Sequence, residues 1–146
     1  MGTVTVRAAQ AQELPRLAAW NAQLIRDEGN DSALSLEEIQ ARLRDWLSGG
    51  YRAYVFEVDE VAFGYAIHRD LPDCTHLRHF FVEAAFRRRG LGRRAFELLR
   101  REAFPADRRT LVEALVSNAA GVAFWQSVGF TQRYVGLQLA PATQGR

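Results

Sequence analysis

Hydrophobic residues recur along the chain at two spacings, which predict two kinds of element. Alternation of apolar and polar residues, or a short apolar run between turn residues, indicates a β-strand. The strands expected on this basis cover residues 3–7, 51–58, 61–68, about 75–82 and 110–117, with closing strand material, hairpin-like around 132 and 133, in 130–139. Asp59 and Glu60 form the tight turn between the second and third strands.

Apolar residues three to four positions apart predict four helices. These helices run from about residue 10 to 25, from 36 to 47, from 91 to about 104 and from 119 to 128. Ser35 and Glu38 have the spacing of a capping box at the start of the second helix, and Asn118 is a suitable N-cap for the fourth. The stripe of the first helix consists of Leu14, Leu17, Asn21, Leu24 and Ile25.

The order of these elements predicts an α+β fold with a mixed, mainly antiparallel central sheet flanked by helices. The fourth strand, third helix and fifth strand form a βαβ unit, so these two strands are expected to be parallel. The earlier strands, joined by a hairpin, are expected to be antiparallel. A chain of 146 residues is long enough for one domain, expected over residues 1–139 and followed by a disordered tail at 140–146.

Residues 86–94, with the sequence FRRRGLGRR, lie between the fourth strand and the third helix. A glycine loop that opens a helix turns free backbone N–H groups toward an anion. Gly90 and Gly92 carry no Cβ and allow a close approach, while arginines supply forked donors for phosphate oxygens. We interpret this stretch as a pyrophosphate-binding loop; the alternative is a solvated arginine face.

The distribution of charge favours a compact polyanion over a nucleic acid. All 19 basic residues are arginine, and residues 87–109 contain nine of them with three acids, whereas the rest of the chain contains ten with fourteen acids. A nucleic-acid-binding surface spreads its charge along a face, among aromatic groups. No metal site is expected either, because the histidines at 68, 76 and 79 lack a metal-ligand spacing.

Two motifs together resemble the GNAT superfamily of N-acetyltransferases over nearly the whole chain. The family's acetyl-CoA signature, Arg/Gln-x-x-Gly-x-Gly/Ala, is matched by Arg87-x-x-Gly90-x-Gly92. The later stretch from Asn118 through Ala123-Phe124-Trp125 to Gly129-Phe130 resembles the family's Asn-x-x-Ala-x-x-aromatic-Tyr-x-x-x-Gly-Phe ending. One departure is Trp125, which stands where many members carry a tyrosine as general acid toward the departing thiolate. Tyr134 and Tyr65 are possible substitutes.

The resemblance implies that acetyl-CoA is the cosubstrate and that an acetyl group passes directly to a primary amine of a small molecule or a peptide or protein N-terminus. Backbone N–H groups near Phe81 and Val82 would hold the oxyanion. The cofactor-binding residues that it implies are Phe80, Phe81, Val82, Arg87, Arg88, Arg89, Gly90, Leu91, Gly92, Arg93, Asn118 and Trp125. The alternative is a catalytically degenerate module that binds acyl-CoA or docks a partner.

Glu113 is the first candidate for the base that deprotonates the amine. It lies five residues before Asn118, where the chain resembles ribosomal-protein alanine acetyltransferases and their catalytic glutamate. A lone acid in an apolar strand also needs an explanation, because an unpaired buried carboxylate is costly. The alternative is that Glu113 reaches solvent or pairs with an arginine.

His79 is the second candidate base, because histidine titrates near neutral pH. Alternation places His79 and His76 on opposite faces of the fourth strand, and either could instead be a hydrogen-bonded structural residue.

The acidic loop with Asp27, Glu28 and Asp31 is the expected site of contact with a cationic acceptor, or else a solvated loop. The chain starts directly with strand pattern and lacks a signal peptide or an apolar span of about 20 residues, so a cytoplasmic protein without membrane contact is expected. The sequence leaves the oligomeric state open, with a homodimer as one option.

Overall fold

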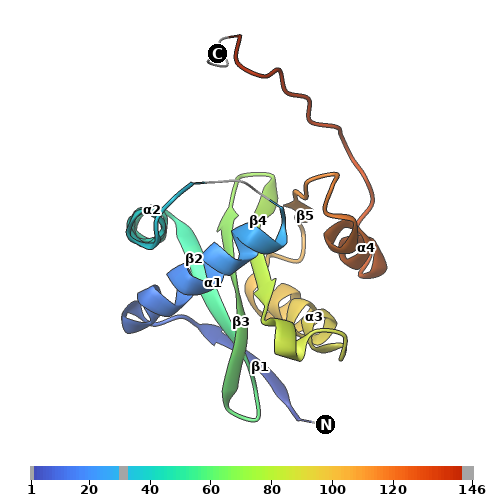
Figure 1. Ribbon diagram of the computed structural model, residues 1–146. Helices are drawn as coiled ribbons and strands as arrows, with labels where there is room; N and C mark the ends of the chain where they lie inside the picture. The colour runs from blue at the N-terminus through green and yellow to red at the C-terminus, as the bar shows by residue number, and fades with distance from the viewer. Residues whose placement is uncertain (1, 30–32, 143–146) are drawn as a thin grey trace.

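The computed structural model describes residues 2–29 and 33–142. Five strands form one sheet in the order β1-β2-β3-β4-β5. Neighbouring strands are antiparallel from β1 to β4, and β4 and β5 are parallel (Figure 1). The predicted mixed α+β sheet with a single parallel pair is therefore confirmed.

The elements follow the predicted order, with small changes at most boundaries. The strands are β1 (Val4–Ala8), β2 (Tyr51–Val58), β3 (Val61–Asp70), β4 (Cys74–Val82) and β5 (Arg109–Val112). The helices are η1 (Ala11–Glu13), α1 (Leu14–Asp27), α2 (Leu36–Ser48), η2 (Ala84–Phe86), α3 (Leu91–Ala103) and α4 (Ala119–Ser127). Ser35 caps α2 and forms the predicted capping box with Glu38.

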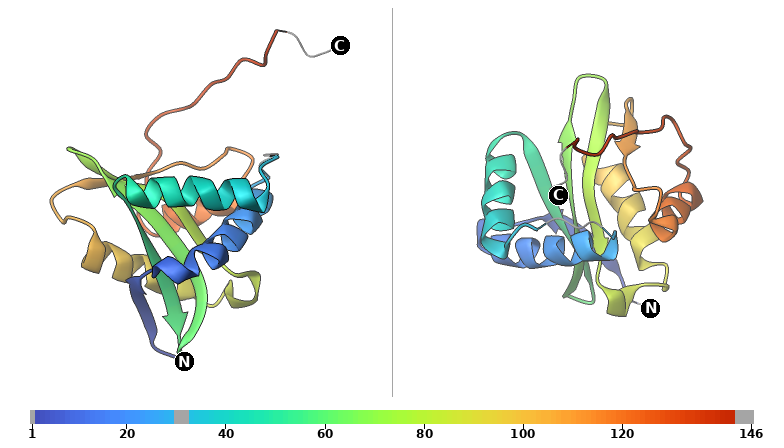
Figure 2. Two further views of the ribbon diagram at one scale, coloured as in Figure 1. Left: turned by 90° about the vertical axis from the view of Figure 1, so that its left-hand side faces the viewer. Right: turned by 45° about the horizontal axis from the view of Figure 1, so that its top comes forward.

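The helices cover the two faces of the sheet in pairs, α1 with α2 and α3 with α4 (Figure 2). Each pair closes its own hydrophobic core. The first core contains Leu17, Leu43, Tyr65 and other residues of α1, α2 and the sheet. The second contains Phe56, Leu99 and the residues that α3 packs on β1 to β4, with Trp125 of α4 against it.

A β-bulge in β4 changes which side chains face each core. Ile67 of β3 pairs with His79 and His68 pairs with Leu77, so Arg78 is an extra residue in β4. Leu77 and Phe80 consequently contribute to the same core, although strict alternation would separate them. The same shift brings His76 to the face that carries His79. The prediction that these two histidines lie on opposite faces is wrong. It assumes strict alternation along β4, whereas the bulge adds one residue between them.

Two predicted strands are also wrong in extent. β5 ends at Val112 instead of residue 117, and residues 130–142 contain no strand. The ladder between β4 and β5 ends at Leu77 and Val112, one residue before the bulge, so residues 113–117 have no strand beside them. Residues 131–142 leave the body of the protein as an extended segment (Figures 1 and 2). Of the predicted tail, 140–142 are exposed without regular structure, and 143–146 lie outside the described residues.

Substitution of Gly64 tests how closely the backbones of β3 and β4 approach each other. A Cβ on Gly64 would overlap the backbone oxygen of Phe81, so Gly64→Ala is expected to lower the free energy of unfolding by about 1–3 kcal/mol, the usual cost of overpacking. Urea unfolding followed by circular dichroism measures this loss. Gly136→Ala is the matched control, because no atom lies within 4 Å of its Cβ position. Equal stability of the two variants would contradict the close approach.

Candidate functional site

The site is an opening between β4 and the segment that follows β5. Beyond Leu77, β4 continues to Val82 with β3 on one side and, among the described residues, no strand on the other. The Glu83 N–H donates to Phe63 O, and the Phe81 carbonyl lies against Gly64, so the backbone groups of Phe81 and Glu83 face β3. Because backbone groups alternate along a strand, those of Phe80 and Val82 face the opening.

The glycine loop closes one end of this opening. Arg88 (φ 63°) and Gly90 (φ 76°) adopt left-handed conformations, and α3 begins directly after Gly90. No side chain caps this helix. The first N–H groups of α3 therefore remain available, and they carry the positive end of the helix dipole toward the loop. Gly92 lies here, with Val82 and Phe124 side chains 3.5 Å from the position of a Cβ.

The arginines of the loop divide into two groups. Arg87 donates from Nε to Val82 O at 2.6 Å and from Nη2 to Asp27 Oδ2 at 2.6 Å. Arg93 donates to Ser127 O at the end of α4 and pairs with Glu97. Arg88 and Arg89, in contrast, are exposed at the loop. Two of the predicted phosphate-binding side chains are thus held by the protein itself, and two project toward solvent.

Asn118 and Trp125 position α4 beside the loop. The Asn118 side chain accepts a hydrogen bond from Gly121 N and caps α4, as predicted. Trp125 packs edge to face on Phe80, Phe96 and Phe130, with ring centroids 5.2–5.6 Å apart. Its indole is a packed aromatic against the second core.

His79 lies on the face of β4 that α1 and α2 cover, in a polar network between these two helices. Its Nδ1 lies 3.2 Å from the Tyr65 hydroxyl and 3.3 Å from Asn21 Nδ2. Asn21 Oδ1 in turn accepts from Arg42 at 3.0 Å. Burial lowers the pKa of His79 to about 3, and the Arg42 and Arg78 cations act in the same direction. His79 is therefore neutral near pH 7 and a weak base.

The sequence does not single out Asn21 as a site residue, and it offers Tyr65 only as a possible general acid. Asn21 and Tyr65 are almost fully buried, and burial raises the pKa of the Tyr65 hydroxyl. The sequence does carry one signal, since Asn21 stands on an otherwise apolar helical stripe. A polar residue at such a position requires a hydrogen-bonding partner across the helix–sheet interface.

Glu113 follows β5 directly, at the mouth of the opening. Its side chain is 66% exposed and lies 3.6 Å from His76 Nε2. The Tyr134 hydroxyl donates to Glu113 Oε2 at 3.4 Å. Glu113 thus reaches solvent, which was one of the alternatives. The neighbours of its carboxylate are a histidine and a tyrosine instead of an arginine.

The acidic loop after α1 lies beside the glycine loop. Asp27 pairs with Arg87. Partial burial alone would raise the pKa of the Asp27 carboxyl, but hydrogen bonds from Arg87 and Gln23 lower this pKa overall. Burial raises the pKa of Glu28, and the Asp27 charge adds to the effect. Trp20 makes a second link by donating from Nε1 to Glu83 at 2.8 Å. Asp31 lies outside the described residues.

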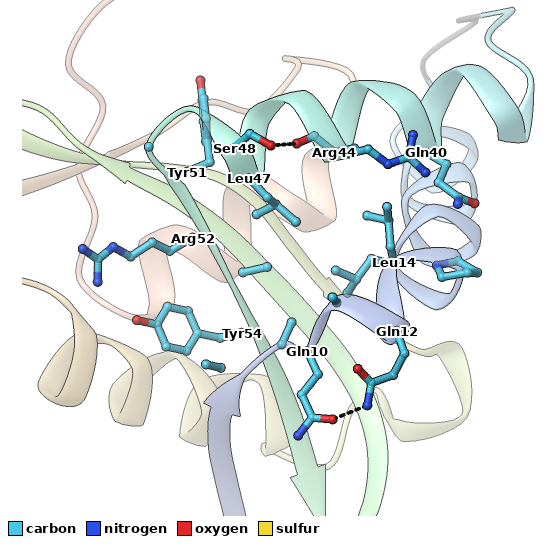
Figure 3. A pocket seen from close by; sticks show the side chains of 17 residues that line it. Gln10, Gln12, Leu14, Gln40, Arg44, Leu47, Ser48, Tyr51, Arg52 and Tyr54 are labelled. Atoms are coloured by element: carbon cyan, nitrogen blue, oxygen red, sulfur yellow. Dashed lines mark hydrogen bonds between the residues drawn. The ribbon is translucent and has the colours of Figure 1, made fainter.

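A hollow of about 980 Å³ lies away from this opening (Figure 3). It is a groove between the start of α1, the end of α2 and strands β1 and β2, with Leu14, Leu47 and Tyr51 in its wall. None of the predicted site residues lines it. The candidate residues instead surround the opening between β4 and the segment after β5.

A parallel strand pair that opens beside a glycine loop, with an uncapped helix after the loop, presents free backbone N–H groups. The model of the acetyltransferase (GNAT) family matches residues 16–130. The chain belongs to this family. No curated protein matches the sequence.

Solved structures of acetyltransferases share the fold at low sequence identity. The aminoglycoside N-acetyltransferase AAC(6')-Iy in complex with CoA is 16% identical, with a TM-score of 0.73 and 97% of each chain covered. A predicted acetyltransferase with acetyl-CoA from Clostridium acetobutylicum is 16% identical (TM-score 0.74), with 94% of this chain and 96% of that chain covered. The ribosomal-protein-alanine N-acetyltransferase from Brucella melitensis biovar Abortus 2308 is 14% identical (TM-score 0.72), with 94% and 99% covered.

No helix in residues 2–29 and 33–142 is long and apolar enough to cross a membrane. No group of three or more His, Cys, Asp and Glu side chains among them could hold a metal ion.

The neutral state of His79 predicts a pH-dependent stability. Its folded pKa lies below the unfolded value of about 6.5, so the unfolded chain takes up the proton first and stability falls as the pH drops below about 6.5. Each pH unit costs at most ~1.4 kcal/mol, until the pH approaches the folded pKa of about 3.

Urea unfolding at about pH 7 and about pH 5 measures this dependence, with His79→Gln as the comparison, because glutamine can hydrogen-bond and does not titrate. The variant is expected to lose a smaller part of its stability than the wild type between these two pH values. The same loss in both proteins would show that His79 does not carry the effect.

Proposed function

We propose that this protein transfers the acetyl group of acetyl-CoA to a primary amine. The observation that carries the proposal is the opening beside β4, where the backbone of Phe80 and Val82 has no strand partner among the described residues, closed by the uncapped start of α3. An extended chain that ends in a pyrophosphate matches both parts, the strand edge and the helix N-terminus. The CoA and acetyl-CoA complexes among the structural neighbours support this choice of cosubstrate.

The backbone of β4 and of the glycine loop would hold the cosubstrate. Phe80 and Val82 face the opening and would hydrogen-bond an extended arm, with the Val82 N–H near the oxyanion. The loop and first turn of α3 would bind the pyrophosphate through backbone N–H groups, while Arg88 and Arg89 supply positive charge from the exposed side. A bound acetyl-CoA supplies the thioester that the amine attacks.

Glu113 is the better supported base. An amine with a pKa near 10 must lose a proton before it attacks. Glu113 is exposed at the mouth of the opening, where a water molecule could relay the proton. His79 is turned away into the network with Asn21 and Tyr65, and its pKa of about 3 makes it a poor proton acceptor.

No tyrosine in the described residues clearly replaces the general acid whose position Trp125 occupies. The Tyr65 hydroxyl is fully buried and bonded to His79, and Tyr134 donates to Glu113. We propose that the thiolate departs without a dedicated acid, since a thiol with a pKa near 8.5 is a tolerable leaving group.

The acceptor would approach over the loop after α1. Asp27 is already occupied by Arg87, which leaves Glu28 as the half-buried carboxylate available for a cationic amine. The identity of the amine remains a matter for experiment, and a panel of polyamines, aminoglycosides, amino acids and peptides would define it.

Trp125 favours one alternative, a module that binds acyl-CoA without turnover. Both functions require cosubstrate binding, so calorimetry with acetyl-CoA comes first. Release of free thiol from acetyl-CoA across the amine panel then separates them. Tight binding without turnover of any acceptor would favour the non-catalytic module.

Replacement of Gly92 tests the cosubstrate site. The branched side chain of Gly92→Val would project beside Val82 and Phe124 into the space in front of the α3 N-terminus, so CoA affinity is expected to fall at least tenfold. Gly92→Ala is the graded control, because its Cβ would make only ordinary contacts of 3.5 Å. Calorimetry measures affinity, and thermal unfolding checks that both variants fold. Unchanged CoA affinity in Gly92→Val would remove this loop from the site.

Glu113→Gln tests the base, because it keeps volume and hydrogen bonding and removes basicity. We expect kcat/KM to fall by ~10² to 10⁴ near neutral pH, the usual contribution of a general base. The loss should shrink at high pH, where more of the amine is already neutral, and CoA affinity should remain unchanged. Glu102→Gln, on the exposed face of α3, is the control. Wild-type kcat/KM in Glu113→Gln over the whole pH range would exclude Glu113.

A further inference from the structure

Arg42 of α2 and Arg78 of β4 converge on one tryptophan ring, on the face of the sheet that α1 and α2 cover. Their Cζ atoms lie 4.8 Å and 4.5 Å from the centre of the Trp46 ring. No carboxylate in residues 2–29 and 33–142 is within ion-pair distance of either guanidinium. Burial lowers the pKa of Arg42, and the Arg78 cation acts in the same direction. Two like charges are thus held close together without an anion to offset their repulsion.

The surroundings hold this pair of arginines in place. Arg42 Nη2 donates to Asn21 Oδ1 at 3.0 Å, while Arg42 Nε is buried without a hydrogen-bond partner. The Trp46 ring is itself stacked on Tyr51, with centroids 5.2 Å apart. Arg78 is the extra residue of the β4 bulge and is exposed. An anion would therefore meet two cations that the protein orders in advance and does not neutralise itself.

An acidic residue lies near the same buried tyrosine as Arg42. Burial is the main cause of the raised pKa of the Tyr65 hydroxyl; of the nearby charges, Glu28 raises this pKa and Arg42 lowers it. Glu28 and Arg42 are not paired with each other. The surface around Tyr65 thus carries a negative and a positive group, and a ligand that complements it carries both charges as well.

The pyrophosphate of the cosubstrate does not account for an anion at these arginines. The glycine loop that would hold the pyrophosphate follows Val82, which is about 13 Å along the strand from Arg78, and leads into α3. Helices α3 and α4 cover the opposite face of the sheet from α1 and α2 (Figure 2). An anion at Arg42 and Arg78 would therefore come from the second substrate, on the side from which the acceptor would approach.

We propose that the amine acceptor also carries a carboxylate, which Arg42 and Arg78 bind. This inference rests on the proposed acetyl transfer. Guanidinium groups match a carboxylate with forked donors, and Glu28 draws the amine end of the same molecule. The acceptor is thus a free amino acid or an acidic peptide, whereas polyamines and aminoglycosides carry only positive charge and are repelled by the arginines.

The reaction on such an acceptor is the one proposed above. The amine nitrogen forms a bond to the thioester carbon, the carbon–sulfur bond breaks, and the amine proton leaves through Glu113. The products are CoA and an N-acetylated acid. The carboxylate takes no part in the bond changes, so Arg42 and Arg78 act in binding and in orienting the amine.

Matched pairs of acceptors test the preference for a carboxylate. The free-acid arm uses glycine, β-alanine and γ-aminobutyrate, each against its own amide, and the peptide arm uses Ala-Glu-Ala amide against Ala-Gln-Ala amide. Rates are compared at equal concentrations of unprotonated amine. We expect the best acid to exceed its neutral partner at least tenfold in kcat/KM, and the arm in which this occurs identifies the source. Turnover of polyamines or neutral amides at an equal or higher kcat/KM would overturn the inference and leave the acetyl transfer intact.

Replacement of Arg78 tests whether the arginines carry this preference. Arg78 is exposed, so Arg78→Gln removes one cation without opening the core. We expect KM for the preferred acid to rise at least tenfold, with kcat and KM for acetyl-CoA little changed. Arg44→Gln is the matched control, because Arg44 is an exposed arginine on the same helix as Arg42. A preference that survives Arg78→Gln, or that falls equally in both variants, would overturn the assignment.

Binding of the N-acetylated products gives a readout that does not depend on turnover. Calorimetry compares each N-acetylated acid with its N-acetylated amide, in the wild type and in Arg78→Gln. We expect the wild type to bind one of the acids at least tenfold more tightly than its amide, and Arg78→Gln to lose this difference. Such binding without thiol release in any assay would support the anion site and contradict the acetyl transfer. Equal affinity for all pairs, or no binding up to about 10 mM, would overturn the anion site.

Discussion

The extra residue in β4 is the constraint on which the site depends. Arg78 shifts the register against β3, and the parallel ladder to β5 stops one residue earlier, at Leu77. A continuous ladder would have used the backbone groups of Phe80 and Val82 in hydrogen bonds to β5. Beyond the bulge these groups have no strand partner among the described residues, and of the two carbonyls Val82 O accepts from Arg87. The two strands diverge at the same point, so the local irregularity accounts for the opening.

The bulge also explains why a histidine near the site is structural. It turns His79 toward α1 and α2, where Asn21 and Tyr65 hold the ring and Arg42 completes the network. Burial disfavours an added proton, and the Arg42 and Arg78 cations act in the same direction, so the ring stays neutral. The network fixes the α1–α2 layer on the sheet, while the links from Trp20 to Glu83 and from Asp27 to Arg87 tie the end of α1 to the glycine loop.

The sequence predicted what depends on neighbours along the chain. The capping box at Ser35, the N-cap at Asn118 and the loop at Gly90 all rest on local spacing, and each is present. What it could not predict depends on pairing across the sheet. The bulge at Arg78 has no local signal in the sequence. The pattern of residues 113–117 and 130–139 is compatible with a strand, but it does not show whether a partner strand lies beside them. The site roles of Glu113 and Glu28 remain predictions.

Two arginines of the glycine loop are held by contacts within the protein. Arg87 and Arg93, which local sequence suggested as phosphate donors, are fixed by Asp27, Val82 O and Ser127 O. Their side chains therefore hold the loop and α4 in place before any ligand arrives. An anion would then meet backbone N–H groups that need no ordering, and a preorganised site of this kind loses less free energy on binding than one built from mobile arginines. Arg87 also joins the end of α1 to the glycine loop, because its guanidinium pairs with Asp27.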